Sequence, residues 1–463
     1  MKTQLNIVSG IYATDTGDLR TSYPINLIPT SKDSGISASY MRNGYGIKHV
    51  FDGPGLDRGG SVIDHRHLRV MGTSLIHVIN DTYTVLGEIP GTDLVKFAQG
   101  FDRIGIAADG NLYYLIGNEV TQVTDSSLGY VKDLLWIDGY FTTTDGVSIV
   151  ITDLNDPTYV NPLKYGSAES DPDEISCLIK YKNELYAVGR YTIETFQNIG
   201  GDGFPFQRIN GTMQSRGALN RDCCLVYGEQ IVFVGGGKNE ALSLWTLVGG
   251  LTQNISNREL DIALNAEPNP SSIRLEQVLM DGYHFLYVHL SNGTYVFDGN
   301  ASKTLQKDIW HKLSTGITGN EKYRGRNFTL SIHPTKLFEP GFYCSDPDST
   351  SIGVLDIHDG DHWGEAIKWS FNTPIFYAEG SMILHEIELI ALSSTDNQEK
   401  ISAEYSLDGI SWSMPKIKQF SREKKISWLR EGWFRKRRLY RFKGSSDCKM
   451  IFTNLEITGE PLV

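Results

Sequence analysis

Helical patterning is almost missing from this sequence of 463 residues. Only 257–267 (NRELDIALNAE) is expected to form a helix, and 272–279 (SIRLEQVL) is ambiguous between helix and strand. Apolar runs of about 18 residues are also missing, which excludes a membrane-spanning helix. The first 20 residues have no apolar core of signal-peptide length, so we expect a protein that is not exported by that route.

Cysteine is scarce, and its spacing excludes two further classes of protein. The odd number of cysteines and the absence of a CxxC pair argue against a disulfide framework and against a zinc knuckle. We therefore expect reduced thiols and assembly in a reducing cytoplasm. The five cysteines are Cys177, Cys223, Cys224, Cys344 and Cys448.

Catalytic signatures are missing as well. The chain has no GxSxG elbow, no HExxH, and no GxGxxG placed between a strand and a helix. The run Gly235-Gly236-Gly237-Lys238 is not a phosphate loop, because Asn239 follows the lysine where Ser or Thr is needed. Acidic residues are also frequent, as at 171–174, but the sequence does not distinguish a catalytic pair of carboxylates from ordinary surface charge. We expect no enzyme activity, no catalytic residue, no cofactor and no metal.

The chain has instead many short β-type runs joined by tight turns. Its 47 glycines and 23 tyrosines suit turns between aromatic-rich strands. Asx-Gly pairs such as Asp138-Gly139 and Asn292-Gly293 separate alternating runs, which is a strong hairpin signal. Successive runs begin roughly 30 to 60 residues apart, near the blade period of β-propellers. The pattern predicts a six- or seven-bladed propeller over residues 51–373.

Both flanks of this propeller differ from it in pattern. Residues 1–50 contain a turn-rich stretch with Pro24 and Pro29, which favours an extended N-terminal arm. After Pro374 the alternation of apolar and polar residues becomes cleaner, as in sheets with one face in water. We therefore predict a C-terminal β-sandwich over residues 374–463. The complete expectation is an all-β fold with an arm, a propeller and a sandwich.

Charge is distributed very unevenly along the chain. The formal net charge is −12, yet 411–443 carries twelve Lys or Arg against two Glu, so this segment is +10 and the remainder −22. The run FRKRRLYRFK (434–443) is expected to be a strand with cations on both faces. The residues alone leave two interpretations open, a solvated edge strand and a surface that docks an acidic partner. The candidate docking residues are Arg435, Lys436, Arg437, Arg438, Arg441 and Lys443.

Three further motifs have ordinary structural interpretations. The pair His65-x-His67 has a metal-compatible spacing, but two polar side chains on an exposed strand are expected. The stretch 358–363 (HDGDHW) is interpreted as a solvated Asp-Gly turn, with cation binding left open. The stretch 406–412 (SLDGISW) nearly matches the Asp-box of sialidase-type propellers. We expect a hairpin there, whose Trp412 anchors the turn against the sandwich core.

Several short motifs resemble those of one known family, the tail hub of short-tailed phages, also called the tail accessory factor or packaged-DNA stabilisation protein. Three lie in the middle of the chain, at 151–154 (ITDL), 168–173 (AESDPD) and 192–196 (TIETF). The order of Asp408-Gly409 and the strand 437–443 is similar too, and weaker similarities occur at Pro24-x-Asn26 and Arg58-Gly59. The resemblance runs along nearly the whole chain, with divergent loops at 200–220 and 300–325.

The resemblance implies a non-catalytic virion protein assembled in the host cytoplasm. Such a protein forms a hexameric ring beneath the portal and its adaptor, prolongs the DNA channel, and stabilises the packaged DNA. Its implied partners are other copies of itself, the portal–adaptor assembly, the tail needle, and the tailspike or fibre. The alternative from another class is a glycan-binding or glycan-hydrolysing propeller of sialidase or lectin type, which needs converging Arg and carboxylate groups at the propeller mouth.

The charge distribution agrees with a hub. Duplex DNA carries a phosphate charge about every 1.7 Å of its axis, so a strongly basic channel would hold it. An acidic body lets DNA slide, and the basic segment is expected to face a protein partner or another subunit. Charge reversal at Arg435, Arg437 and Arg438 is therefore predicted to impair tail assembly while the subunit stays folded.

Overall fold

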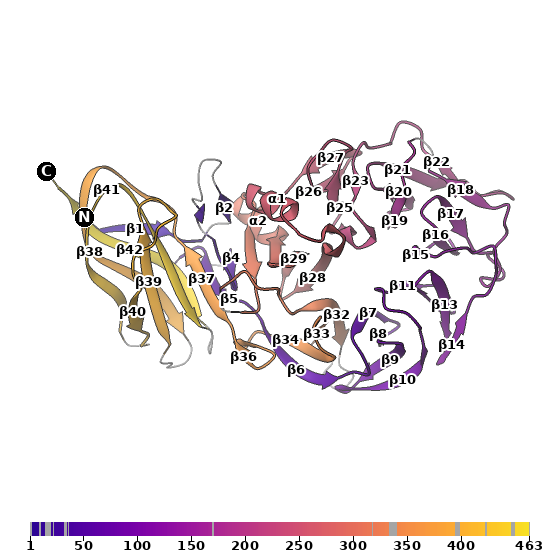
Figure 1. Ribbon diagram of the computed structural model, residues 1–463, viewed down its shortest axis with the longest axis horizontal. Helices are drawn as coiled ribbons and strands as arrows, with labels where there is room; N and C mark the ends of the chain where they lie inside the picture. Colours follow the sequence, from indigo (N-terminus) through magenta and orange to yellow (C-terminus); the bar gives the residue numbers. More distant parts are fainter. Residues whose placement is uncertain are drawn as a thin grey trace.

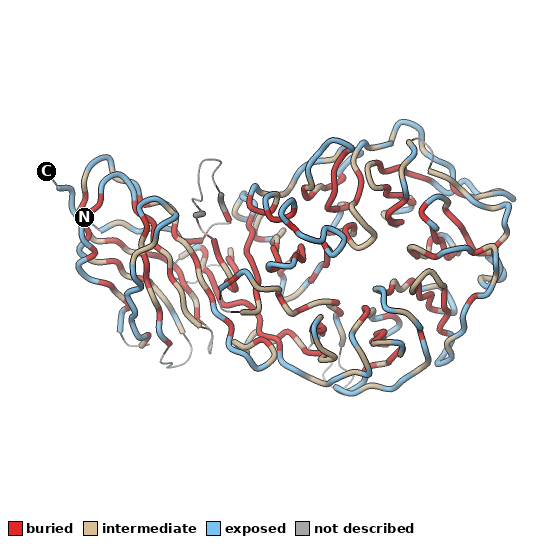
Figure 2. The backbone as a smooth tube through the Cα atoms, in the orientation of Figure 1, coloured by how far each residue is buried: buried red, intermediate tan, exposed pale blue. Residues whose placement is uncertain are grey.

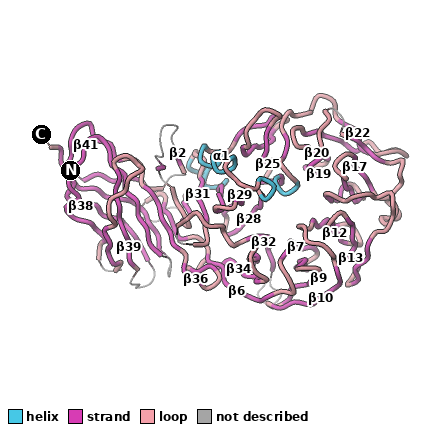
Figure 3. Tube along the Cα trace, in the orientation of Figure 1, coloured by secondary structure: helices cyan, strands magenta, loops and turns pink. Residues whose placement is uncertain are grey.

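The computed structural model describes residues 2–8, 11–13, 20–21, 23–31, 35, 37–168, 171–316, 318–332, 340–393, 399–421, 424–445 and 450–462. A propeller and a sandwich lie next to each other along the long axis of the molecule (Figure 1). Strands form nearly all of the regular structure (Figure 3). The predicted fold class is confirmed, and the propeller has seven blades.

The first three blades are antiparallel meanders of four strands. Asx-Gly and related turns join the strands, since Asp, Asn and Gly adopt the left-handed backbone that tight hairpins require; Asp138, for example, has φ 52°. Blade 1 contains β7 (Asp57–Ile63), β8 (Arg66–Met71), β9 (Ser74–Ile79) and β10 (Thr82–Glu88). Blade 2 contains β11 (Lys96–Gln99), β12 (Ile104–Ala108), β13 (Asn111–Ile116) and β14 (Glu119–Gln122). Blade 3 contains β15 (Asp133–Ile137), β16 (Tyr140–Thr144), β17 (Ser148–Ile151) and β18 (Tyr165–Ser167).

The next three blades repeat the meander with small additions. Blade 4 contains β19 (Ile175–Tyr181), β20 (Glu184–Gly189), β21 (Ile193–Asn198) and β22 (Phe206–Arg208). Blade 5 contains β23 (Gly217–Ala218), β24 (Cys224–Tyr227), β25 (Gln230–Gly236), β26 (Ser243–Val248) and β27 (Leu251–Asn254), with the 3-10 turn η1 (Arg221–Cys223) before β24. Blade 6 contains β28 (Arg274–Met280), β29 (Tyr283–Leu290), β30 (Gly293–Asp298) and β31 (Trp310–Leu313).

Two short helices accompany blades 5 and 6. Helix α1 (Arg258–Asn265) begins where the side chain of Asn257 accepts a hydrogen bond from the backbone of Leu260, so the one expected helix is confirmed. Helix α2 (Gly299–Leu305) lies between β30 and β31, and the 3-10 turn η2 (Pro270–Ser272) precedes β28. No helix in the described ranges is both long enough and apolar enough to cross a membrane.

Blade 7 closes the ring with a strand from the other end of the propeller. Strand β6 (Gly46–Asp52) pairs antiparallel with β34 (Ser351–Asp356), outside β33 (Pro340–Ser345) and β32 (Arg326–Ile332). The short strands β35 (Asp361–His362) and β36 (Glu365–Ala366) extend the same sheet. Since β6 directly precedes β7 of blade 1, this pairing joins the first and last blades and closes the ring.

The core of the propeller consists of separate apolar clusters between neighbouring blades. Each seam has its own cluster, and buried segments occur all around the ring (Figure 2). The seam between blades 1 and 7 also contains a buried ion pair. Arg69 is 0 % exposed, and its Nη1 lies 2.8 Å from Oδ2 of Asp57. Its Nη2 donates to the carbonyl oxygen of Asn327 in blade 7 at 2.8 Å.

The sandwich is built around two long strands. Strand β41 (Ile426–Ser445) pairs from Ile426 to Arg438 with β38 (Phe376–Ser393), and its remaining residues pair with strands of the other sheet, so β41 passes from one sheet to the other. The two sheets enclose an aromatic core with Trp369, Trp428 and Phe442. The strand order is β4-β5-β42-β38-β41-β39-β40, with β1 on β42 and β37 on β41. Their bounds are β1 (Lys2–Asn6), β4 (Leu27–Thr30), β5 (Tyr40–Asn43), β37 (Lys368–Asn372), β39 (Lys400–Ser406), β40 (Lys416–Gln419) and β42 (Met450–Pro461).

Residues 1–50 are shared between the two bodies. Strands β1, β4 and β5 belong to the sandwich, β6 belongs to blade 7, and the hairpin of β2 (Tyr12–Ala13) and β3 (Arg20–Thr21) contacts α1. Apolar side chains explain this placement, because Leu27 and Met41 are 0 % and 1 % exposed in the sandwich core. The sandwich sheet also begins at β37, earlier than the expected start at residue 374.

Candidate docking surface

Side chains close the axis of the propeller. Arg221 on η1 reaches across from blade 5, where its Nη2 donates to the carbonyl oxygen of Leu94 at 2.8 Å and its Nη1 to that of Lys132 at 3.0 Å. Lys96 of blade 2 meets Asp222 of blade 5, with 3.5 Å between Nζ and Oδ1. The cavity that remains measures about 320 Å³. This volume suits a small molecule, and no duplex passes along the axis of a single propeller.

The charged groups at this axis are paired with each other. Glu276 contacts Arg274, and its Oε2 lies 3.3 Å from Nε2 of His289. Burial opposes the ionisation of Glu276, but Arg274 and His289 outweigh that effect and lower its pKa to about 2. The glycan-active alternative needs arginine and carboxylate groups at the propeller mouth. Such groups do lie at the axis, but they pair with side chains of neighbouring strands.

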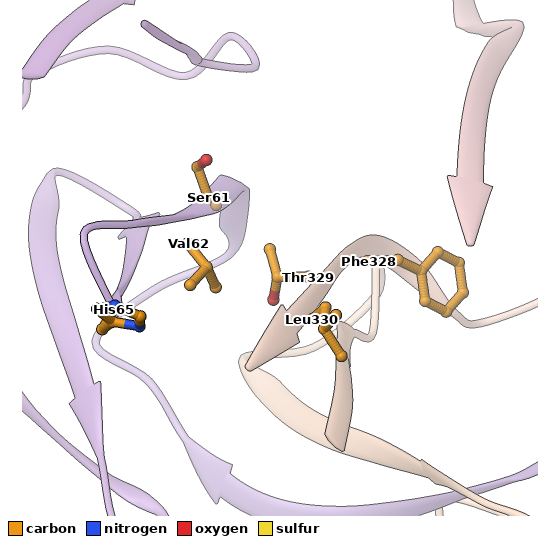
Figure 4. Close-up of a pocket in the computed structure, with 7 residues that line it drawn as sticks. Ser61, Val62, His65, Phe328, Thr329 and Leu330 are labelled. Carbon is orange, nitrogen blue, oxygen red and sulfur yellow. The ribbon is translucent and has the colours of Figure 1, made fainter. Parts of the chain in front are cut away.

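A second cavity lies at the seam between blades 1 and 7. It measures about 440 Å³, and Figure 4 shows Val62 of β7 facing Thr329 and Leu330 of β32 across it. The side chains that line it are mainly apolar or hydroxylic, and His65 is the one titratable group among them. Acid–base catalysis needs a second titratable group within reach, so this lining offers no catalytic pair.

The two histidine motifs do not form metal sites in the described part of the chain. His65 lies in the turn before β8 with φ 63°, whereas His67 is 2 % exposed and its Nε2 lies 2.9 Å from Oγ1 of Thr329. His67 thus faces the core, unlike the exposed pair that the spacing suggested. His362 is 1 % exposed, and its Nε2 lies 3.2 Å from the carbonyl oxygen of Tyr45. No cluster of three potential ligands occurs among the described residues.

The Asp-box-like stretch is a self-stabilised turn. Asp408 accepts hydrogen bonds from the backbone amides of Ile410 and Ser411 at 2.9 and 2.8 Å. These bonds lower the pKa of Asp408 to about 2. Trp412 stacks under the guanidinium of Arg441, whose Cζ lies 4.0 Å from the ring centroid. The hairpin between β39 and β40 is confirmed, but Trp412 is half-buried and packs on Arg441, not against the sandwich core as expected.

The fold divides the basic run 434–443 into three parts with different surroundings. Arg435, Lys436 and Arg437 are exposed. Arg435 pairs with Ser381 of β38, and the carbonyl of Ser381 accepts a 2.9 Å hydrogen bond from the amide of Leu462. These three cations therefore lie beside the C-terminal segment, at the end of the sandwich away from the propeller (Figure 1).

Arg438 belongs to the interior. It is 2 % exposed, and its Nη1 donates to the carbonyl oxygen of Glu431 at 2.7 Å. Its Nη2 donates to the carbonyl oxygen of Trp433 at 3.0 Å, and its Cζ lies 4.3 Å from the ring centroid of Tyr405. Arg438 was expected among the docking residues, but a side chain with these contacts holds the corner of β41 and does not reach a partner.

Arg441 and Lys443 lie on the outer face of the other sheet and share one carboxylate. Nε of Arg441 donates to Oε2 of Glu404 at 2.9 Å, and Nζ of Lys443 donates to Oε1 at 3.0 Å. Burial opposes the ionisation of Glu404, but these two cations prevail and lower its pKa. Two positive charges against one negative charge leave this part of the face basic.

Exposed aromatic side chains accompany the outer three cations. Tyr377 pairs with Arg437 across the two long strands, and its side chain is 66 % exposed. Trp433 is 63 % exposed and pairs with Ile383. Large exposed aromatic groups next to arginine are typical of protein interfaces. We call Tyr377, Trp433, Arg435, Lys436 and Arg437 the tip surface. The charge pattern of the sequence identified the cations. Tyr377 was not predicted, because it comes from β38 and lies beside Arg437 only through strand pairing.

Two of the three short motifs in the middle of the chain, 168–173 and 192–196, meet in blade 4. Asp173 accepts hydrogen bonds from the backbone amide and the Oγ1 of Thr192, at 2.8 and 3.0 Å. Thr152 is 1 % exposed at the end of blade 3. These motifs therefore fix loops between blades. Glu169 and Ser170 of the same loop, like Arg422 and Cys448 elsewhere, lie outside the described residues.

The remaining cysteines and the Arg58-Gly59 motif are structural. The four cysteines that the structure describes are free and buried, Cys177, Cys223, Cys224 and Cys344. Arg58 is 4 % exposed and joins blades 1 and 2, because its Nη1 donates to the carbonyl oxygen of Ile89 at 2.7 Å and its Nη2 contacts Asp109 at 3.0 Å.

Two family models match the chain. One is described as the β-propeller of bacteriophage P22 Gp10 and matches residues 3–359, and the other is described as its β-sandwich and matches residues 368–460. No curated protein matches the sequence.

Solved structures similar to this chain include other propellers at low identity. The N-terminal domain of Nup159 is 11% identical over 73% of this chain and 99% of its own, with a TM-score of 0.43. BBS1N, in complex with ARL6DN, is 11% identical over 68% and 97%, with a TM-score of 0.42. The extracellular domain of the putative one component system BT4673 from B. thetaiotaomicron is 10% identical over 85% and 56%, with a TM-score of 0.44.

Proposed function

Because the chain belongs to the bacteriophage P22 Gp10 family of phage tail structural proteins, we propose that it is the hub of a short-tailed phage tail. In this role it forms a ring below the portal and its adaptor, prolongs the DNA channel, and helps to retain the packaged DNA. The observation that carries the proposal is the match of both bodies, the propeller and the sandwich, to the two parts of one phage tail protein.

The closed axis of the propeller supports a channel made by several copies. Arg221, Lys96 and Asp222 bridge the axis, so the DNA path of a hub has to run between subunits. A closed ring of identical chains provides such a path on its symmetry axis, and six copies are the number that the family resemblance implies.

The charge of the body fits contact with moving DNA. Outside 411–443 the chain carries a formal charge of −22, so the surface available to line a channel is predominantly acidic. Acidic walls repel phosphates and leave DNA free to slide during ejection. The basic residues are concentrated in the sandwich, where they suit protein partners.

We assign the tip surface to a partner of the tail. Arg435, Lys436 and Arg437 supply charge, while Tyr377 and Trp433 supply exposed aromatic area. An acidic surface of the adaptor, the needle, or the tailspike or fibre complements this combination. The proposed work is non-catalytic, in agreement with charged groups that pair among themselves at the propeller axis.

DNA retention tests the proposed function directly. Heads packaged in the absence of this chain are mixed with the purified protein, and DNA release is followed by nuclease sensitivity. We expect the heads to lose DNA alone and to retain it after the protein is added. Equal loss with and without the protein would contradict the hub function.

A further inference from the structure

A basic groove lies where the sandwich meets the propeller. It measures about 610 Å³ and is lined by β37, β39, β40 and the last residues of β41, with Ile25 and Gly319 on the other side. Strand β37, which forms part of its floor, is the sandwich strand next to the propeller (Figure 1). The lining contains three lysines, Lys368, Lys400 and Lys443, and no carboxylate. Because Lys443 pairs with the neighbouring Glu404, the net positive charge of the groove comes from Lys368 and Lys400.

Strand register explains why the lysines converge. Ser370, Lys443, Ser402 and Ile417 lie directly opposite one another on four neighbouring strands. Alternate residues of a strand share a face, so Lys368 and Lys400, two positions from Ser370 and Ser402, point the same way. Lys368 and Lys400 are exposed, and Ile417 is 60 % exposed. The groove thus combines positive charge, hydroxyl groups and one exposed apolar side chain.

One face of the propeller has the complementary charge and shape. In blades 1 to 6 the turn from the first to the second long strand lies on the same face, because each meander begins at the axis and runs outward in the same sense. Exposed acidic residues occupy these turns in five of the blades, Asp64, Asp102, Asp138, Glu229 and Asp281. Asp102 differs from the others, because its turn spans 100–103 and its carboxylate lies 2.7 Å from Nη2 of Arg103. The two-residue turns of blades 1, 3, 5 and 6 are narrow and convex, and each presents a carboxylate.

From this complementarity we infer that the basic groove of one copy receives an acidic hairpin turn of the propeller of a second copy. The inference rests on the proposed ring, and it specifies which surfaces make the contact. The groove and the turns are different surfaces of the chain, so the contact is heterologous, and repetition of such contacts closes a ring when the rotation permits. The tip surface remains free for another partner.

Sedimentation velocity of the purified chain tests the contact, at about 50 mM and about 500 mM salt. Screening shortens the range of exposed charges from roughly 14 Å to roughly 4 Å between these conditions. We expect concentration-dependent association at low salt that weakens at high salt. In K368E/K400E the association is expected to weaken by at least about tenfold. The control K48E/K424E makes the same charge change at exposed lysines outside the groove and keeps wild-type association.

A charge exchange then identifies the partner surface. Lysine fits these turns, since Lys182 occupies the turn of blade 4 with φ 54°. D64K/D138K is expected to associate weakly alone, and mixing it with K368E/K400E is expected to restore association. A monomeric wild type at about 100 μM and low salt, equal weakening by the control, or failure of the mixture would each overturn the inference. The DNA-retention result is independent of these outcomes, because it depends on the hub as a whole.

Discussion

The side-chain amide of Asn26 donates a 2.8 Å hydrogen bond to the carbonyl oxygen of Lys368, at the junction of the sandwich and the propeller. The same amide donates to the carbonyl oxygen of Ser314 at 2.9 Å, and its Oδ1 accepts from the amide of Ser314 at the same distance. Asn26 is 0 % exposed and has φ 55°. One side chain therefore joins β37 of the sandwich to the segment after β31 of blade 6.

Replacing Asn26 by Asp is predicted to loosen this junction. A carboxylate cannot donate to the two carbonyl oxygens, and it leaves a buried charge facing them, which costs about 3 kcal/mol or more. The free energy of unfolding is measured by urea denaturation. The control is Asn80→Asp. Asn80 has φ 52°, so its backbone conformation is the same as that of Asn26, but its side chain is exposed and does not join the two bodies. Equal stability of both variants would show that Asn26 does not hold the junction.

Reversing charge in the basic run is predicted to have two different effects. R435E/R437E changes exposed side chains of the tip surface, so the subunit stays folded but tail incorporation falls. Arg438→Glu places a carboxylate beside the carbonyl oxygens of Glu431 and Trp433, and the sandwich is expected to lose about 3 to 5 kcal/mol of stability. Circular dichroism melting and incorporation into particles separate the effects. Normal incorporation of R435E/R437E would contradict docking through the tip surface.

Acid is predicted to destabilise the protein through buried neutral histidines. Burial lowers the pKa of His362 to about 4, below its unfolded value of about 6.5. The unfolded chain therefore binds the proton first as pH falls, and stability that is complete above pH 6.5 decreases towards pH 4, by about 1 kcal/mol per pH unit for this residue.

His362→Gln isolates this effect, because Gln can keep the bonds to Tyr45 and Thr315 without titrating. The pH slope of the unfolding free energy should become shallower by that amount, whereas His358→Gln, at an exposed residue of the same segment, should leave it unchanged. Identical slopes for wild type and both variants would rule out a contribution from His362.

Closure of the propeller is predicted to depend on Arg69. Arg69→Met removes the charge that faces Asp57, whose side chain is 1 % exposed, and an unpaired buried carboxylate costs about 3 to 5 kcal/mol. Arg66→Met on the same strand removes only bonds near the surface, to Gly117 and Asn118, and is expected to cost less than about 1 kcal/mol. Thermal melting compares the two. A smaller loss for Arg69→Met than for Arg66→Met would contradict the role of the buried pair.

Local patterns predicted most of the blades but not their closure. Turns such as Asp138-Gly139 mark hairpins because their chemistry is local. The pairing of β6 with β34 joins residues about 300 positions apart, and no local pattern encodes such a partner. Residues 1–50 were therefore expected as an arm. Helix α2 was not predicted, since its first residues Gly299 and Asn300 resemble a turn, although Asp298 caps it with bonds to two backbone amides.

The candidate docking residues were predicted only in part, because their positions also depend on sheet pairing that a local pattern does not show. Strict alternation placed Lys436 and Arg438 on one face, but Lys436 adopts φ 72° and β41 bends there. The bend exposes Lys436 and buries Arg438 and Leu439 at the corner between the sheets. The groove lysines escaped notice because Lys368 and Lys400 come from strands outside the basic run. Positions that converge through sheet pairing are not visible in a linear pattern.

Electron microscopy of the purified chain mixed with portal and adaptor tests the hub most directly. The account predicts a sixfold ring of this chain beneath the adaptor, with an open central channel between subunits and the closed propeller axes arranged around it. Persistent monomers, or a complex in which DNA density passes through the axis of a single propeller, would contradict it.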